Sequence, residues 1–191
     1  MSTNSSICML SKDGKVKEIY CHWDGYMEHN GTILAKHYTD PKKVKELISL
    51  GALSFLGEEI IDKIVEKYGF DYRYNPEAQK EFSEEELNSY KSTVAYHRDR
   101  GEDLEIFEYN NINDFLKSIK KYGVREFTYL FVESEAQWYL LEYYKCPKPE
   151  LNARKIYLNK RGNAKASKDF VYFFLDENYD SFEDALISKE N

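Results

Sequence analysis

The sequence predicts an α+β domain in which an antiparallel sheet of hairpins carries several short helices packed on it. Two hairpin patterns support this fold class. Residues 5–10 and 16–22 flank an Asp-Gly turn, and residues 127–132 and 137–144 flank Glu133-Ser134-Glu135. Tight turns join these strands, whereas a parallel sheet needs a crossover after each strand, so the antiparallel arrangement is favoured.

Helices are predicted where a capping residue precedes apolar residues that recur every three or four positions. Asp40-Pro41 begins one helix, which Gly51 ends, and Asn111 begins another that continues to Tyr122. Ser83, followed three residues later by Glu86, has the pattern of a capping box. Further helices are predicted over residues 26–38, 58–68 and 181–188.

A third hairpin is predicted with strands at residues 92–97 and 104–109, joined by a turn at residues 98–102. Two prolines, Pro147 and Pro149, interrupt the pattern that follows the second hairpin. They divide the chain into an α+β core domain, residues 1–148, and a peripheral C-terminal segment, residues 149–191, packed on the same domain.

Within residues 149–191, the sequence predicts strands at residues 154–158 and 170–175 with a basic loop, residues 159–168, between them.

Charge and aromatic content restrict the partners that the surface can bind. The formal net charge is −7, and residues 58–90 contain ten acidic and four basic side chains. An acidic surface repels nucleic-acid phosphates and attracts basic partners, so direct nucleic-acid binding is not expected. Seventeen tyrosines supply rings with polar tips, which suit both a core and a contact surface. The alternative is that the charges only keep the surface solvated.

The cysteine pattern and the N-terminus point to a reducing compartment. Cys8, Cys21 and Cys146 are an odd number without a C-x-x-C pair, which argues against a disulfide framework. No basic segment followed by an apolar run begins the chain, and no run approaches 18 apolar residues. The expectation is therefore a cytoplasmic protein that neither enters nor crosses a membrane.

The residues from Tyr20 to His37 contain three of the four histidines. Imidazole and carboxylate are common metal ligands, so His22, Asp24 and His29 are candidate ligands. Their spacing matches no zinc or iron pattern, and we expect no cofactor. The structural alternative is that Trp23 and Tyr26 anchor the first hairpin to the following helix and Asp24 forms a turn with Gly25.

Residues 96–103 form a second candidate cluster. His97 and Asp99 could act as an acid–base pair, with Arg98 or Arg100 holding an anion. The alternative is a solvated hairpin turn with cross-strand ion pairs. No G-x-S-x-G, P-loop or G-x-G-x-x-G motif accompanies either cluster.

The motif Y-C-H-W-D-G-Y at residues 20–26, followed by Glu28, Gly31 and His37-Tyr38, resembles a family of small proteins encoded by bacteriophages and prophages. R-D-R-G-E at residues 98–102 matches a later element of that family, whereas Met27 replaces its usual proline. The resemblance covers the first fifty residues and this one later element. It implies a phage accessory protein of a class that manipulates host defence.

Two functional hypotheses from different classes follow. The first is a phage-encoded, non-enzymatic, anti-CRISPR-like inhibitor in the host cytoplasm, which binds a defence protein such as a basic nucleic-acid-binding effector. Its acidic, tyrosine-rich contact surface would include Glu84, Glu85, Glu86, Asp99, Glu102, Asp103, Tyr26 and Tyr96.

The second hypothesis is a small metal-dependent hydrolase or nucleotide-degrading anti-defence enzyme that uses His22, Asp24 and His97. A third option is a structural or regulatory phage module, and self-association into a homodimer would favour it.

Overall fold

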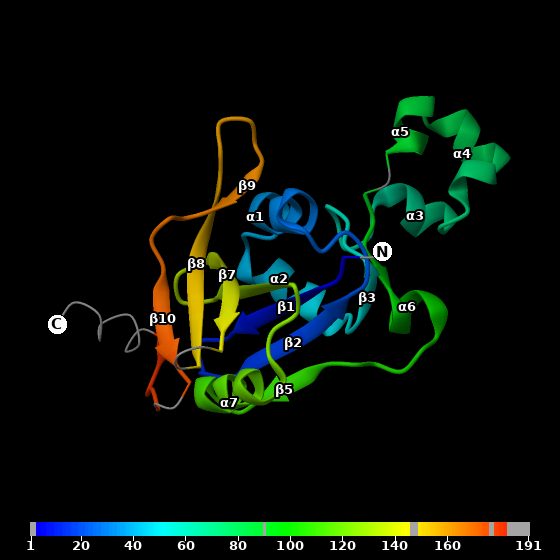
Figure 1. Cartoon of the computed structure of the whole chain (residues 1–191). Helices are drawn as coiled ribbons and strands as arrows, with labels where there is room; N and C mark the ends of the chain where they lie inside the picture. The colour runs from blue at the N-terminus through cyan, green and yellow to red at the C-terminus, as the bar shows by residue number, and fades with distance from the viewer. Residues whose placement is uncertain (1–2, 90, 146–148, 176–177, 183–191) are drawn as a thin grey trace.

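A single ten-stranded sheet organises the chain in the computed structural model, which describes residues 3–89, 91–145, 149–175 and 178–182 (Figure 1). The strand order is β10-β8-β7-β6-β1-β2-β3-β4, with β5 also paired to β2 and β9 to β8. The strands are β1 Ser5–Leu10, β2 Val16–Cys21, β3 Leu53–Phe55, β4 Val94–Ala95, β5 Phe107–Tyr109, β6 Phe127–Val132, β7 Gln137–Tyr144, β8 Glu150–Leu158, β9 Ala164–Ala166 and β10 Val171–Phe174.

Three helices begin at the capping residues that the sequence indicates. The Asp40 and Asn111 side chains accept hydrogen bonds from the backbone of Lys42 and Asp114, and Ser83 forms a complete capping box with Glu86. Within the described residues, no helix has the length and apolar character needed to cross a membrane. The helices are η1 Met27–Gly31, α1 Thr32–His37, α2 Pro41–Ser49, α3 Lys63–Tyr68, η2 Tyr72–Tyr74, α4 Pro76–Glu81, α5 Glu84–Asn88, α6 Tyr96–Arg100 and α7 Ile112–Tyr122.

The α+β class is confirmed, but the expectation of a purely antiparallel sheet is wrong. The β1–β2 and β6–β7 hairpins are antiparallel as predicted. Strand β1, however, pairs with β6 in parallel, with Ile7 opposite Tyr129, and β2 pairs with β3 in parallel. Turn residues determine how neighbouring strands pair, but they do not determine how separate hairpins join across a long excursion such as residues 22–126.

Helices cover both faces of the sheet, so the central strands are buried on both sides. In β1, Ile7 and Met9 join the core beneath α1 and α2, whereas Cys8 and Leu10 join the core beneath α7. All six residues of β1 are buried. This period-two alternation between two cores explains why the four consecutive apolar residues Ile7–Leu10 are all buried.

The predicted hairpin over residues 92–109 is wrong. Residues 96–100 form helix α6, which Gly101 ends in the left-handed conformation at φ 69°. The backbone N–H of Ala95 donates to Asp99 Oδ2 at 2.7 Å, which stabilises the helical turn. Strand β4 pairs with β3, while β5 pairs with β2 rather than with β4.

Two other local expectations change, and a third falls mostly outside the described residues. The helix predicted over residues 58–68 begins only at Lys63, because Asp62 caps it and Glu59 pairs with the backbone of Lys91 and Thr93. Strand β9 lies inside the predicted basic loop, where it pairs with β8. Residues 183–188 of the last predicted helix lie outside the described residues. The segment after Pro149 supplies β8, β9 and β10 to the sheet.

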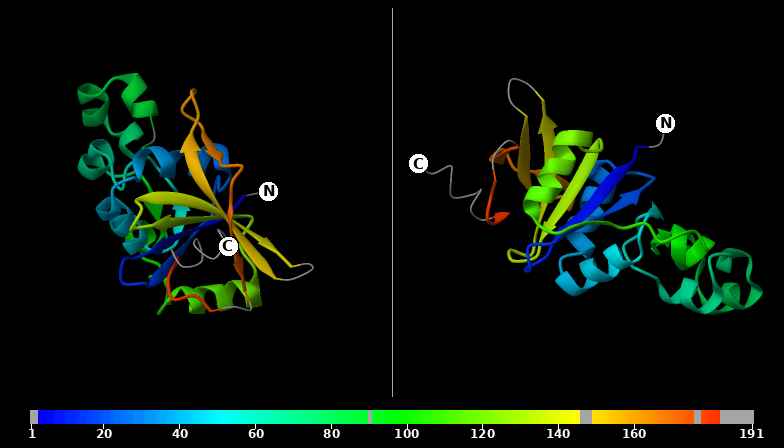
Figure 2. Two further views of the ribbon diagram at one scale, coloured as in Figure 1. Left: turned by 90° about the vertical axis from the view of Figure 1, so that its left-hand side faces the viewer. Right: turned by 90° about the horizontal axis from the view of Figure 1, so that it is seen from below.

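A group of four short helices projects from the edge of the sheet, and the views of Figures 1 and 2 agree on this. We call residues 62–89, with α3, η2, α4 and α5, the helical lobe, and the two segments that connect it, residues 57–61 and 91–93, the neck. Val65, Tyr72 and Ala78 are buried in the lobe as a hydrophobic cluster separate from the two cores of the sheet. The lobe therefore has packing of its own and is inserted between β3 and β4.

Candidate functional site

The motif at residues 20–26 forms buried structural contacts. Asn30 Nδ2 donates to Ser5 Oγ at 3.1 Å, to Cys21 Sγ at 3.4 Å and to the Trp23 carbonyl at 3.4 Å. The Tyr129 hydroxyl donates to the Gly25 carbonyl at 2.8 Å. Burial raises the pKa of the Cys21 thiol to about 11, which keeps it protonated and unreactive at neutral pH.

The structure does not gather the candidate metal ligands. His22 Nδ1 lies 2.8 Å from the Tyr20 hydroxyl, and His29 Nδ1 lies 2.9 Å from Asn30 Oδ1. Asp24 occupies the turn at φ 54°. Across the described part of the chain, no group of three or more His, Cys, Asp or Glu residues is arranged to hold a metal ion, and this applies to the set His22, Asp24 and His97.

The predicted turn role of Asp24 fits this geometry, but Trp23 does not act as the predicted anchor. Its side chain is 46% exposed and packs edge-to-face against His22, with ring centroids 4.7 Å apart. Trp23 is therefore an exposed contact residue beside the first hairpin.

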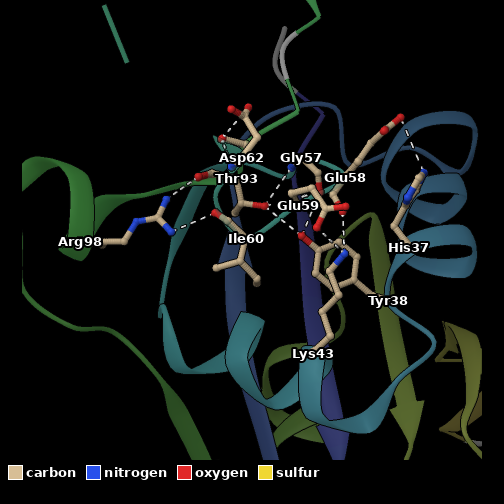
Figure 3. Close-up of polar contacts among 11 residues, drawn as sticks. His37, Tyr38, Lys43, Gly57, Glu58, Glu59, Ile60, Asp62, Thr93 and Arg98 are labelled. Atoms are coloured by element: carbon tan, nitrogen blue, oxygen red, sulfur yellow. Dashed lines mark hydrogen bonds and ion pairs between the residues drawn. The ribbon is translucent and has the colours of Figure 1, made fainter. Parts of the chain in front are cut away.

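Arg98 clamps the two segments of the neck together (Figure 3). Its guanidinium donates to the Ile60 carbonyl at 2.9 Å and to the Thr93 carbonyl at 2.6 Å. Two further bonds, at 2.7 and 2.9 Å, reach the Asp99 carboxylate, whose side chain is only 9% exposed. Arg98 and Asp99 thus form an ion pair with each other. The predicted His97–Asp99 acid–base pair does not form, because His97 Nδ1 instead contacts the Glu102 carbonyl at 2.7 Å.

The neck is also fastened to the helices of the sheet domain (Figure 3). The Tyr38 hydroxyl donates to the Gly57 carbonyl at 3.0 Å and lies 3.1 Å from Thr93 Oγ1. Lys43 Nζ donates to the Glu58 carbonyl and to the Glu59 carboxylate, both at 2.9 Å. Sequence analysis missed this network because its residues lie up to 55 positions apart and form no motif.

The predicted acidic contact residues Glu84, Glu85 and Glu86 lie on α5, at the surface of the lobe. Glu86 is engaged in the capping box, where Ser83 lowers the pKa of its carboxyl. The carboxylates of Glu84 and Glu85 have no hydrogen bond or ion pair to any residue that the structure describes. They are exposed and available for an external partner.

A groove of about 360 Å³ lies between α3 and α5, beside Glu85. Ile64 and Phe82 provide its apolar lining, and its charged lining is mixed, with Asp62, Glu85 and Glu86 acidic and Lys63 and Lys91 basic. A groove with apolar lining and charges of both signs suits a partner segment that carries apolar and charged side chains.

The other predicted contact residues lie apart from the lobe helices. Tyr96, Glu102 and Asp103 line a hollow of about 530 Å³ next to Tyr20. Tyr26 is half-buried, and its ring lies 6.0 Å from that of His29. Asp99 lies at none of these places, because its side chain is only 9% exposed and is held by Arg98. The structure therefore divides the rest of the predicted contact set between the lobe, this hollow and the start of η1.

Comparison with known proteins adds no relative: the chain matches no protein-family model, no curated protein and no solved structure. Function is therefore inferred from the geometry of the lobe, the neck and the clefts.

Proposed function

We propose that this protein is a non-enzymatic inhibitor that binds a basic host protein through its acidic helical lobe. The observation that carries the proposal is the lobe itself. It projects from the sheet, has its own small core, and presents the exposed carboxylates of Glu84 and Glu85 on α5, with Glu85 beside a partly apolar groove. Projecting surface with unpaired charge is suited to contact with another macromolecule rather than to enclosing a small substrate.

The neck supports this function because it holds the lobe in a defined orientation. Arg98 joins both neck segments, and Tyr38 and Lys43 tie them to the helices above the sheet. A binding surface that is already ordered loses less conformational entropy when the partner binds. The lobe can therefore dock as a preformed unit.

The charge of the lobe indicates the class of partner. Residues 62–89 contain eight acidic and four basic side chains, and two of the basic ones, Lys67 and Lys80, pair with Glu81 and Glu77. Exposed excess negative charge accelerates encounter with a positively charged surface, such as the channel of a nucleic-acid-binding effector. The resemblance of residues 19–51 to phage proteins directs the search for this partner to bacterial defence proteins.

The test is affinity capture of a basic partner from bacterial extract. Three proteins are immobilised for it: the wild type and two charge-reversal variants. Glu84→Lys/Glu85→Lys reverses the two unpaired lobe charges, whereas the control Glu126→Lys/Asp169→Lys makes the same charge change at exposed positions on the sheet domain. We expect the first variant to lose the partner and the control to retain it, with binding of the wild type falling as salt rises.

The electrostatic docking would be overturned if the wild type and both variants captured the partner equally, or if binding did not change with salt. A His22→Ala/His97→Ala variant distinguishes a binding protein from an enzyme, because a binding protein retains full inhibition without either imidazole. Loss of inhibition by this variant while it still captures the partner would favour the enzyme.

A further inference from the structure

A cleft of about 710 Å³ lies between α7, β5 and the sheet, on elements that do not include the lobe. This volume is within the range of small-molecule sites, roughly 300–1,000 Å³. Phe107 and Tyr109 come from β5, and Phe115, Ser118 and Tyr122 come from α7. The remaining lining residues are Asn4, Glu18, Ile119, Gly123, Val124, Arg125 and Thr128.

Glu18 places a half-buried carboxylate in this cleft. Oε1 accepts from the Ser6 hydroxyl at 2.5 Å, and Oε2 accepts from the Tyr109 hydroxyl at 3.0 Å. Among the described residues, no Lys, Arg or His nitrogen lies within 4.0 Å of Glu18 to form an ion pair. A carboxylate has about four acceptor positions, so two of them remain for a cationic donor.

Aromatic rings surround the carboxylate. Phe107 lies directly opposite Glu18 in the β2–β5 register and is 53% exposed, and Tyr122 is 74% exposed. Burial raises the pKa of Tyr109 to about 12, so this phenol remains neutral and its hydroxyl continues to donate a hydrogen bond to Glu18. Aromatic faces next to an anionic group attract an organic cation that has an apolar stem.

Arg125 supplies a charge of opposite sign at another part of the lining. Its guanidinium stacks over the Tyr20 ring at 4.6 Å and makes no hydrogen bond within the described part of the chain. Glu18 and Tyr20 are two residues apart on β2, which corresponds to roughly 7 Å along the strand. The two charges are therefore spaced on the scale of an extended arginine side chain.

We propose that this cleft binds a basic α-amino acid, with the cationic side chain on Glu18, the aliphatic stem between the rings and the α-carboxylate on Arg125. The same chemistry is offered by a free amino acid and by a C-terminal arginine or lysine of a polypeptide. The site is independent of the lobe and of the partner proposed above.

Three matched ligands test the assignment by nuclear magnetic resonance titration of the full chain. L-Arginine carries both charges, L-citrulline replaces the guanidinium with a neutral urea, and agmatine lacks the carboxylate. We expect saturable shifts at residues 18, 107–109 and 118–125 with L-arginine, and at least tenfold weaker binding of the other two, because each loses one charge-assisted contact. The tripeptide Gly-Gly-Arg distinguishes the sources: tighter binding than L-arginine assigns a polypeptide terminus, and weaker binding assigns the free amino acid.

Two variants and a control locate the contacts. Glu18→Gln keeps the shape of the side chain and is expected to weaken L-arginine binding about tenfold or more. Glu108→Gln removes a carboxylate from the opposite side of β5, where it pairs with Lys17, and is expected to change nothing. Arg125→Gln, at an exposed position, is expected to reduce L-arginine to the affinity of agmatine without affecting agmatine itself.

Absence of saturation at millimolar L-arginine would overturn the proposal, as would equal binding of L-citrulline. Glu18→Gln and Glu108→Gln acting alike would also overturn it. Since none of these variants alters the lobe, their outcome is separate from the capture experiment.

Discussion

Replacement of Arg98 by alanine tests whether one side chain holds the lobe to the sheet. The substitution removes four hydrogen bonds to three groups: the Ile60 carbonyl, the Thr93 carbonyl and the Asp99 carboxylate. It also leaves Asp99, with a side chain 9% exposed, without its counter-ion. We therefore expect the substitution to lower the free energy of unfolding and to weaken the attachment of the lobe to the sheet.

The magnitude follows from the burial of the pair. Breaking a buried ion pair costs about 3–5 kcal/mol. The Arg98 side chain remains 26% exposed, so solvent screening reduces the expected cost to about 2–4 kcal/mol. For a chain of this size, a loss of about 3 kcal/mol lowers the melting temperature by roughly 6–12 °C.

The assay combines thermal unfolding with amide hydrogen exchange. We expect Arg98→Ala to lose protection first at Glu59 and Thr93, whose backbone bonds join the neck segments at 2.9 and 2.8 Å. Arg161→Ala is the matched control, because this exposed side chain has no described partner and its loss should change stability by less than about 0.5 kcal/mol. If Arg98→Ala behaved like Arg161→Ala in both measurements, the clamp would be refuted.

Three further outcomes are expected. The pKa of the Glu81 carboxyl is lowered by Lys67, and that of Glu86 is lowered by Ser83, from the ordinary value of 4.5. These contacts therefore stabilise the lobe above pH 4.5, and this stabilisation is lost as the pH falls below that value. Amide exchange protection of α4 and α5, compared at about pH 3 and about pH 6, measures the loss. Gly25→Ala places a methyl group 2.5 Å from the Asn4 backbone and should cost about 1–3 kcal/mol in chemical denaturation, whereas an unchanged midpoint would contradict the close approach. Tyr38→Phe removes the hydroxyl that donates to Gly57 and should cost about 1–3 kcal/mol; a loss below that range would mean that Thr93 Oγ1, 3.5 Å from the same carbonyl, takes over the bond.

Local signals in the sequence predicted the elements whose stabilising contacts are also local. The first hairpin follows from two strand-forming segments on either side of an Asp-Gly turn, in which Gly14 adopts φ 83°. Helix α7 follows from the Asn111 cap and from Phe115, Leu116 and Ile119 on one face. In both, the residues that determine the conformation are neighbours in the sequence.

The predicted hairpin over residues 92–109 is wrong because capping interactions, and not apolar content, determine the conformation of residues 96–101. Asp99 and Gly101 are the signals of a short helix, since one accepts the Ala95 N–H and the other ends the helix in the left-handed conformation. A run of five helical residues is too short to show an apolar period, so only these two residues could have indicated it.

The parallel pairing of β1 with β6 and the cleft at Glu18 were beyond sequence analysis for one shared reason. Ile7 and Tyr129 are opposite each other although 122 positions separate them, and Glu18 meets Phe107 across 89 positions. Such contacts depend on how the whole sheet assembles, and neither strand carries a turn or cap that specifies its distant neighbour.

The geometry of residues 20–26 also explains why a distinctive motif can be uninformative about function. Cys21 and Gly25 are fully or nearly fully buried, and Asn30 and Tyr129 use their polar groups to bind the backbone and side chains of this segment. The buried residues of this segment determine whether the chain folds, whereas Trp23 stays exposed beside them. The charges on which the two proposals rest are Glu84 and Glu85 on the lobe and Glu18 and Arg125 in the cleft, and none of them lies within residues 20–26. Function in this fold must therefore be tested at the lobe and the cleft, where substitution leaves the motif intact.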